Sequence, residues 1–258
     1  MKINVLALGD VVGPRAVEYL KQHLWNLRRE RNISLAVVNG ENACVGNGLD
    51  AASAKQLLAS GADVITSGNH IWHKKDIKDF LNDTDSLIRP ANYRATTPGS
   101  GYMKINAEGY VFLVINIMGV VYMDPLENPF YTVERILDYE RGRYDFAVLD
   151  IHAEATSEKY ALARYFDGRV HIMFGTHTHV QTADEQILEK GSGFICDVGM
   201  TGPHDSVLGI RNECIIEKLM TNLPVKFEIA EGEIKANGAI FSLDADSGRV
   251  ADVERFTF

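Results

Sequence analysis

The sequence predicts an α/β (α+β) protein with two facing sheets between helical layers. Strand-like apolar runs alternate with helical patterns through the first hundred residues, which is typical of parallel strands covered by helices. A predicted hairpin and a β-rich C-terminal third add antiparallel strands, so we expect mixed sheets.

The first five elements are predicted in the order β-α-β-α-β. Ile3 to Leu8 is an almost continuous apolar run, as expected for a strand covered on both faces. Pro14 suits the first turn of a helix, and apolar residues recur every three or four positions from Val17 to Leu27. A strand at 35–38, a helix at 51–60 and a strand at 63–66 follow.

The rest of the chain is predicted to contain both kinds of element. The predicted elements are a helix at 74–81, a hairpin at 101–106 and 110–116, a helix at 132–141, a strand at 146–151, a helix at 157–166 and a strand at 170–174. Beyond Gln181 the short segments 194–198, 225–230 and 239–243 predict a C-terminal third that is mainly β. No linker or repeat interrupts the chain, so we expect residues 1–258 to form a single domain.

Composition limits the classes of partner. The formal net charge of −9 argues against a stable nucleic-acid complex, which normally requires a basic patch, but it allows a small phosphorylated substrate. Three cysteines without a C-x-x-C pair predict a reduced, cytoplasmic protein. The longest apolar stretch, Val111 to Met123, is shorter than the roughly 20 residues of a membrane helix, so no membrane association is expected.

Five strand-like runs lead directly into residues that commonly bind metals. These residues are Asp10, Glu41 with Asn42, Asn69 with His70, His152, and His177 with His179. Ligands of an open α/β sheet bind beyond the carboxyl ends of its strands, so we expect these side chains to meet. They are too many for one ion, which takes about four to six donors. The sequence therefore predicts a binuclear metal centre.

The donor types restrict the metal and its arrangement. A carboxylate offers two oxygens, which makes Asp10 and Glu41 the candidates for a bridge between two ions. Carboxylate, amide and imidazole donors favour iron or manganese, with zinc or cobalt as weaker alternatives. If the chain stays extended at His177 and His179, both rings point the same way, toward adjacent ions.

A pair of ions in this setting predicts chemistry at phosphorus. Two ions about 3.5 to 4 Å apart stabilise the attacking and departing oxygens, and a water that bridges them becomes hydroxide near neutral pH. His70 follows the candidate ligand Asn69, and because imidazoles in general exchange protons near neutral pH, His70 is the predicted general acid.

Several other conspicuous residues have simpler interpretations. We interpret His23, His73 and His171 as structural, His204 as part of a surface loop, and Cys44 as an inert thiol. The Gly46 to Gly48 stretch lacks the Lys-Ser/Thr of a phosphate loop, so it is a flexible loop with a weak claim to substrate contact.

The ordered blocks resemble those of the calcineurin-like metallophosphoesterases. They are G-D at Asp10, N-G-E-N, G-N-H and G-T-H-T-H-V. Three positions depart from the general pattern: Val12 stands where a second metal-binding histidine is usual, Glu41 replaces the bridging aspartate, and Thr176 is an extra residue before His177. These departures, with H-A-E-A-T-S-E-K and T-G-P-H-D-S, are similar to one subgroup, the bacterial YmdB-like phosphodiesterases.

The resemblance implies a four-layer αββα sandwich, a di-metal centre with iron as the first candidate, and hydrolysis of cyclic nucleotides, especially 2′,3′-cyclic AMP. It implies one ion at Asp10, Glu41, Asn42 and His179, and another at Glu41, Asn69, His152 and His177. Glu41 would bridge the ions, Asn42 would replace the ligand lost at Val12, and His70 would donate the proton.

Two other functions remain compatible with the sequence. A phosphomonoesterase or nucleotidase would use the same metals but needs cations for a dianionic phosphate, and the ligand blocks contain no Arg or Lys. A regulatory binding protein could keep the metals without needing His70, so His70 favours an enzyme. The oligomeric state is left open, and a homo-oligomer is compatible with the sequence.

Overall fold

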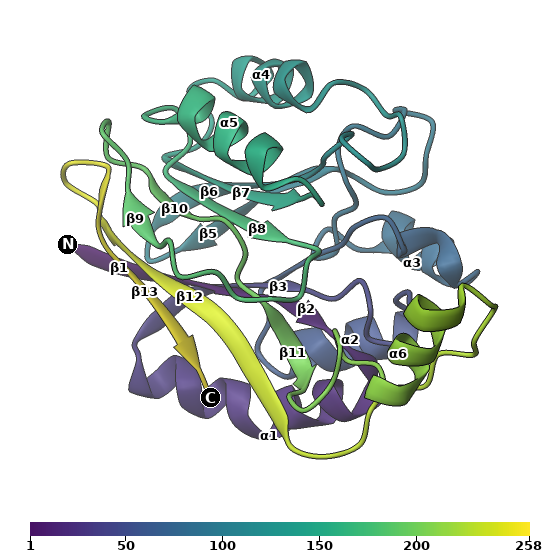
Figure 1. Cartoon of the computed structure of the whole chain (residues 1–258). Helices are drawn as coiled ribbons and strands as arrows, with labels where there is room; N and C mark the ends of the chain where they lie inside the picture. The colour runs from purple at the N-terminus through teal and green to yellow at the C-terminus, as the bar shows by residue number, and fades with distance from the viewer.

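Two β-sheets face each other at the centre of the fold, and helices cover both outer faces (Figure 1). The computed structural model describes all residues, 1–258. The first sheet has the order β2 (Asp10–Val11), β11 (Met200–Pro203), β12 (Ile234–Asp244), β1 (Lys2–Leu8), β3 (Ile33–Asn39) and β4 (Val64–Thr66), with β13 (Arg249–Thr257) paired to β12. The second has the order β5 (Tyr102–Ala107), β6 (Tyr110–Met118), β7 (Phe146–His152), β8 (Ile172–Thr176), β10 (Gly193–Ile195) and β9 (Gln186–Ile187).

The helices divide between the two sheets. The first sheet is covered by α1 (Gly13–Glu30), α2 (Ala51–Ala59) and α3 (Ile77–Asp83), with a 3-10 turn η1 (Ile71–His73) before α3. The second is covered by α4 (Pro129–Tyr139) and α5 (Thr156–Phe166). The remaining helix, α6 (Asn212–Thr221), lies at the side of the layers and buries no residue (Figure 1).

Three apolar cores hold these layers together. Leu6, for example, packs in the core beneath α1, whereas its neighbour Val5 points into the core between the sheets. This alternation follows from the strand, whose successive side chains point to opposite faces. A third core joins the second sheet to α4 and α5. The predicted four-layer αββα sandwich with two mixed sheets is therefore confirmed.

The first half of the chain follows the prediction closely. Strand β1 pairs in parallel with β3, and β3 with β4, through the helices α1 and α2. Strands β5 and β6 form the predicted hairpin. Helix α1 begins with Gly13 and Pro14 and buries one stripe that includes Leu20 and Leu24. No helix of the chain is long and apolar enough to cross a bilayer.

Two predictions were wrong. The helix expected at 74–81 begins only at Ile77, because Lys74 is extended after the 3-10 turn and the Asp76 side chain accepts a hydrogen bond from the Ala51 amide. The segment 225–230 is not a strand, and the C-terminal third, which is mainly β as expected, also contains the unpredicted helix α6. Helix α6 escaped prediction because it packs no apolar stripe against a core, and Leu219 and Met220 stay exposed.

Candidate metal centre

All the predicted site residues lie at the carboxyl ends of strands along one shared edge of the two sheets. The first sheet contributes Asp10 after β1, Glu41 and Asn42 after β3, and Asn69 and His70 after β4. The second contributes His152, the last residue of β7, and His177 and His179 after β8. The predicted metal donors and the predicted acid therefore meet from both sheets, although up to 169 positions separate Asp10 from His179.

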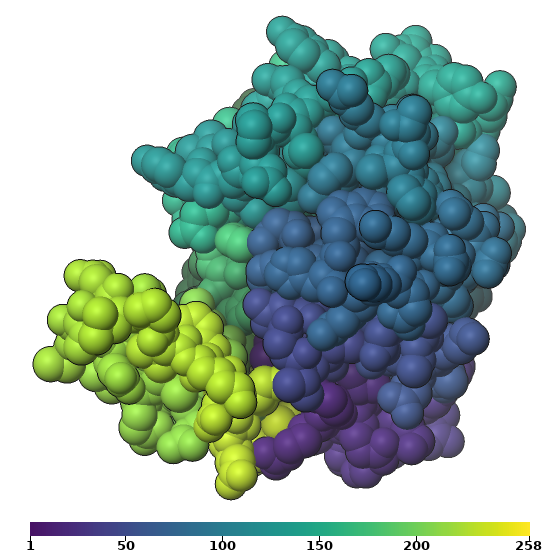
Figure 2. All heavy atoms as spheres, turned by 90° about the vertical axis from the view of Figure 1, so that its right-hand side faces the viewer, coloured from purple at the N-terminus to yellow at the C-terminus, as the bar shows by residue number.

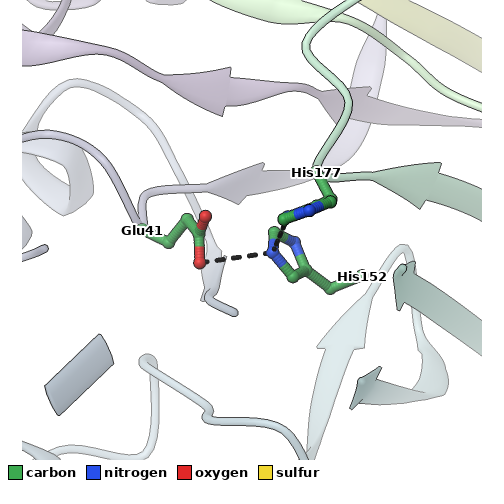
Figure 3. Close-up of side chains that lie close together, drawn as sticks. All are labelled: Glu41, His152 and His177. Carbon is green, nitrogen blue, oxygen red and sulfur yellow. Dashed lines mark hydrogen bonds and ion pairs between the residues drawn. The ribbon is translucent and has the colours of Figure 1, made fainter. Parts of the chain in front are cut away.

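One group of donor atoms surrounds the His152 imidazole. Its Nε2 lies 3.1 Å from His177 Nδ1 and 3.3 Å from Glu41 Oε2 (Figure 3). The same nitrogen lies 3.0 Å from Asn69 Oδ1. A tetrahedral ion with donors at 2.0 to 2.1 Å holds those donors about 3.4 Å apart. The spacing of this group therefore fits one transition-metal ion.

A second group lies around Asp10 and His179. His179 Nε2 is 3.8 Å from Asp10 Oδ1 and 3.2 Å from Asn42 Nδ2, which also donates to Glu41 Oε1 at 3.0 Å. Asp10 Oδ1 is buried and accepts no hydrogen bond. A buried carboxylate oxygen without a partner is costly, and a cation beside it removes that cost. The donor set thus also fits a second ion here.

The charges of the cluster also favour the binding of cations. Asp10 and Glu41 are fully buried, and burial raises the pKa of Asp10. Burial alone would lower the pKa of His152, but the carboxylates of Glu41 and Asp10 raise it to about 9. Burial and the charge of His152 lower the pKa of His177 to about 3. Without metal, a protonated His152 therefore balances the carboxylates, and bound ions would supply that positive charge instead.

Three imidazoles are held by groups outside the donor set. His179 Nδ1 donates to the Leu208 carbonyl at 3.1 Å, and His177 Nε2 pairs with Glu154 Oε2 at 3.2 Å. His152 Nδ1 lies 2.9 Å from the Thr176 hydroxyl. Each contact fixes the ring and leaves its other nitrogen toward the cluster, as is usual for histidines that bind metals.

The loop after β8 is not extended, so the parallel arrangement of the His177 and His179 rings that an extended chain would give does not occur. His177 and His179 have φ of 97° and 63°. The His177 amide donates to Asp10 Oδ2 at 3.0 Å, and the Thr178 amide to Asp197 Oδ2 at 3.2 Å, which bends the backbone away from a strand. As a result the two imidazoles diverge, one toward each group of donors.

Two features of the backbone bring the donors close. A Cβ at position 68 would collide with Glu41 Oε2 and His152 Nε2, so Gly68 leaves the space that the donors occupy. Asn39 Oδ1 accepts a hydrogen bond from the Glu41 amide at 3.1 Å and so holds the turn in which Glu41 and Asn42 point to the cluster. The chain turns at Glu41, directly after Gly40.

His70 lies between the cluster and solvent. Its Nδ1 is 2.8 Å from Asn42 Oδ1 and 3.2 Å from Glu41 Oε1, and its side chain is 24% exposed. No protein group is hydrogen-bonded to its Nε2, and the ring lines the cavity that opens over the cluster. His70 can thus present Nε2 to a bound molecule while Nδ1 stays fixed.

Sequence reasoning missed the groups that support the donors. They are Asn39, Asp150, Glu154, Asp197 and the Leu208 carbonyl. Asp150 gave a usable signal, because it is a charged residue inside an apolar run; Thr176 donates to it at 2.7 Å and burial raises its pKa to about 6.

The remaining conspicuous residues lie outside the donor set. His23 and His204 are exposed, and the His73 ring packs against the His70 ring in a tilted arrangement with centroids 4.8 Å apart. Cys44 is buried and burial raises the pKa of its thiol, which agrees with an inert residue. Gly46, however, lines the cavity over the cluster.

An αββα sandwich with this donor set at the shared edge of its sheets defines a hydrolase of the phosphoesterase class. A family model described as YmdB-like protein matches residues 6–256, and the chain belongs to this family. A 2′,3′-cyclic-nucleotide 2′-phosphodiesterase of Bacillus subtilis (strain 168) is 43% identical over 253 residues, which cover 98% of this chain and 96% of that protein. The prediction that the chain is an enzyme is confirmed by this similarity.

Solved structures agree with the fold. A hypothetical protein from Thermus thermophilus is 36% identical with a TM-score of 0.92, and 99% of each chain is covered. A novel phosphatase from Mycoplasma pneumoniae is 32% identical with a TM-score of 0.93, covering 100% of this chain and 94% of that one.

Proposed function

We propose that the protein is a binuclear metal-dependent phosphodiesterase that hydrolyses 2′,3′-cyclic nucleotides, 2′,3′-cyclic AMP among them. The observation that carries this proposal is the convergence of two groups of metal donors beside a histidine whose Nε2 is free. The similarity to the Bacillus subtilis phosphodiesterase along nearly the whole chain supports the class of substrate.

Glu41 is the residue that would join the two metal sites. Its Oε2 faces His152, and its Oε1 faces Asn42, so one carboxylate reaches both groups. One ion would then be held by Asp10, Glu41, Asn42 and His179, and the other by Glu41, Asn69, His152 and His177. Iron is the first candidate for both ions and manganese the second, with zinc or cobalt less favoured by this donor set.

Asn42 must turn its amide to act as a ligand. Its Nδ2 now faces Glu41 and His179, while its Oδ1 faces His70. A rotation of the amide by about 180° places the oxygen toward the ion and the NH₂ toward His70, because the two ends have nearly the same shape. Nδ1 of His70 then accepts, which leaves the proton on Nε2, the nitrogen that faces the cavity.

The chain's own residues complete the reaction. Bound ions would neutralise the phosphate and activate a water for attack at phosphorus. Nε2 of His70 would deliver a proton to the departing ribose oxygen, which is a poor leaving group as an alkoxide.

The charges in the cavity favour a diester over a monoester. Lys226 is the only lysine or arginine that lines it, whereas Glu154 and Glu228 add negative charge. A dianionic monoester would be repelled more strongly than a monoanionic diester. The Mycoplasma pneumoniae relative is named a phosphatase, which favours the phosphomonoesterase alternative. The experiment therefore includes monoester substrates.

Metal analysis combined with a substrate panel tests the proposal. We expect two transition-metal ions per chain, activity on 2′,3′-cyclic AMP that is lost in EDTA, and slower turnover of 2′- and 3′-AMP. The proposal fails if the protein holds at most one ion and keeps full activity in EDTA. Faster turnover of the monoesters would support a phosphomonoesterase instead.

A further inference from the structure

The cavity over the metal donors has two chemically different ends. Its volume is about 770 Å³, which is within the usual range of about 300 to 1,000 Å³ for sites that bind small molecules. One end is the polar cluster with His70. The other is a wall formed by residues 207–229, and its apolar side chains are Val207, Leu208, Ile210, Ile215, Phe227 and Ile229. We call this segment the apolar wall.

The apolar wall is fixed relative to the cluster. The Ala230 amide donates to the Gly209 carbonyl and the Arg211 amide to the Glu228 carbonyl, each at 2.9 Å, which closes the base of the segment. An ion pair between Arg211 and Glu228 at 3.1 Å joins its two arms. The Leu208 carbonyl accepts the hydrogen bond from His179, so the wall also touches a metal donor directly.

Phe227 is the aromatic residue of this wall. It lines the cavity, yet the residue is 50% exposed and so is only partly covered by protein. Figure 2 shows the segment, in yellow-green, as a lobe that stands out from the side of the molecule. An aromatic ring presented to solvent beside a polar cluster provides a surface on which a flat apolar group can stack.

We infer that the apolar wall binds the nucleobase of the substrate and that Phe227 is its stacking surface. The inference rests on the proposed function, which places the cyclic phosphate at the cluster; the base then extends toward the other end of the cavity. Stacking on an aromatic ring tolerates every base, because every base has a π-face. The wall therefore selects nucleotides over base-free diesters more strongly than it selects adenine over other bases.

Kinetics with and without a base test this inference. The substrates are 2′,3′-cyclic AMP, 2′,3′-cyclic UMP and methyl ribofuranoside 2,3-cyclic phosphate, which lacks a base. Phe227→Ala should lower kcat/KM for both nucleotides by about 5- to 100-fold, mainly through KM, and leave the base-free diester within about twofold. Phe227→Trp should keep the preference for nucleotides, and Phe227→Leu should lose it while retaining apolar bulk.

A matched control and the metal content separate the outcomes. Tyr131→Ala removes an aromatic side chain of α4 that is 72% exposed and does not line the cavity, so its kinetics should match the parent. Phe227 is not the base-binding residue if its Ala variant, with both metals bound, loses activity equally on all three substrates. The inference also fails if the parent hydrolyses the base-free diester as efficiently as the nucleotides, a result that leaves the phosphodiesterase proposal intact. A parent inactive on all three overturns the proposed function itself.

Discussion

Glu41 is the residue on which both proposed metal sites depend. Its two oxygens face different donors, Oε2 toward His152 and Oε1 toward Asn42. Glu41→Ala should therefore lower the metal content at both sites, whereas Asn42→Ala should reduce it at only one. Elemental analysis of the two purified variants, beside the parent, gives the ratio of metal to protein. Equal ratios in both variants would contradict the bridge.

His70 separates catalysis from metal binding. It belongs to neither proposed set of donors, so His70→Ala should keep both metals while activity on 2′,3′-cyclic AMP falls by about 10²- to 10⁴-fold, the usual cost of losing a general acid. The deficit should be smaller for a p-nitrophenyl diester, since p-nitrophenolate leaves without a proton. Steady-state kinetics on both substrates measure the difference.

Two results would remove His70 from this role. One is a variant that hydrolyses the cyclic nucleotide at the parent rate. The other is an equal loss on both substrates with the metals still bound, which would make His70 a group that positions the phosphate. His73→Ala is the matched control, because His73 contacts His70 but does not line the cavity.

At the scale of elements, a buried ion pair joins α5 to the loop that carries two of the proposed metal donors. Lys159 of α5 and Asp197 are 0% and 1% exposed, and Lys159 Nζ lies 2.7 Å from Asp197 Oδ2. The same oxygen accepts hydrogen bonds from the Thr178 amide and hydroxyl, at 3.2 and 2.7 Å. Thr178 stands between His177 and His179, so the pair fixes the loop on which both imidazoles depend.

Breaking this pair should destabilise the protein and loosen the loop. Lys159→Met leaves the Asp197 charge buried and unpaired, which typically costs about 3 to 5 kcal/mol. The double variant Lys159→Met/Asp197→Asn removes both charges and keeps an acceptor for Thr178, so it should recover part of the loss. Denaturant unfolding measures the stability, and elemental analysis the metal content. Equal stability of the single and double variants would argue against an energetic pair.

The difference between α1 and α6 shows which elements the sequence could predict. Helix α1 buries a stripe that includes Leu20 and Leu24, and this repeat is visible in the sequence. Helix α6 packs on no core, so its formation leaves no comparable pattern. Periodicity reports burial against a neighbouring layer, and an element without that neighbour is invisible to it.

The same limit applies to the site. The meeting of the proposed donors could be predicted because strands of both sheets end at one edge, as in His152 of β7. The groups that hold these side chains in place could not be predicted. Glu154 reaches His177, and Leu208 offers a backbone carbonyl to His179, so both contacts depend on loop conformation and one involves no side chain. No spacing in the sequence encodes such contacts.

At the scale of the whole molecule, we propose that residues 1–258 unfold as one unit. Strand β1 lies between β3 and β12, so the two ends of the chain share one sheet, with Lys2 opposite Asp244. Circular dichroism and tryptophan fluorescence should therefore give one coincident transition in denaturant. Two separated transitions would indicate independent domains.

His171 should make the stability of the molecule depend on pH in mild acid. It lies just before β8, its Nδ1 accepts a hydrogen bond from the Ala147 amide at 3.0 Å, and burial lowers its pKa from 6.5 to about 4. Protonation of Nδ1 would remove that acceptor. Between these pH values the unfolded chain binds more protons than the folded one, so the contribution is complete above pH 6.5 and is lost as the pH falls through 4.

His171→Asn isolates this contribution, because the asparagine oxygen can accept the same hydrogen bond and does not titrate. The parent should lose up to about 3 kcal/mol between pH 6.5 and 4 relative to the variant, and less to the extent that water reaches the partly exposed ring. Urea unfolding at pH steps from 7.5 to 4 measures the difference, with exposed His204→Asn as the control. Titration of carboxylates and loss of metal should affect all three proteins alike. Parallel curves of unfolding free energy against pH for the parent and His171→Asn would therefore show that His171 titrates equally in the folded and unfolded chains.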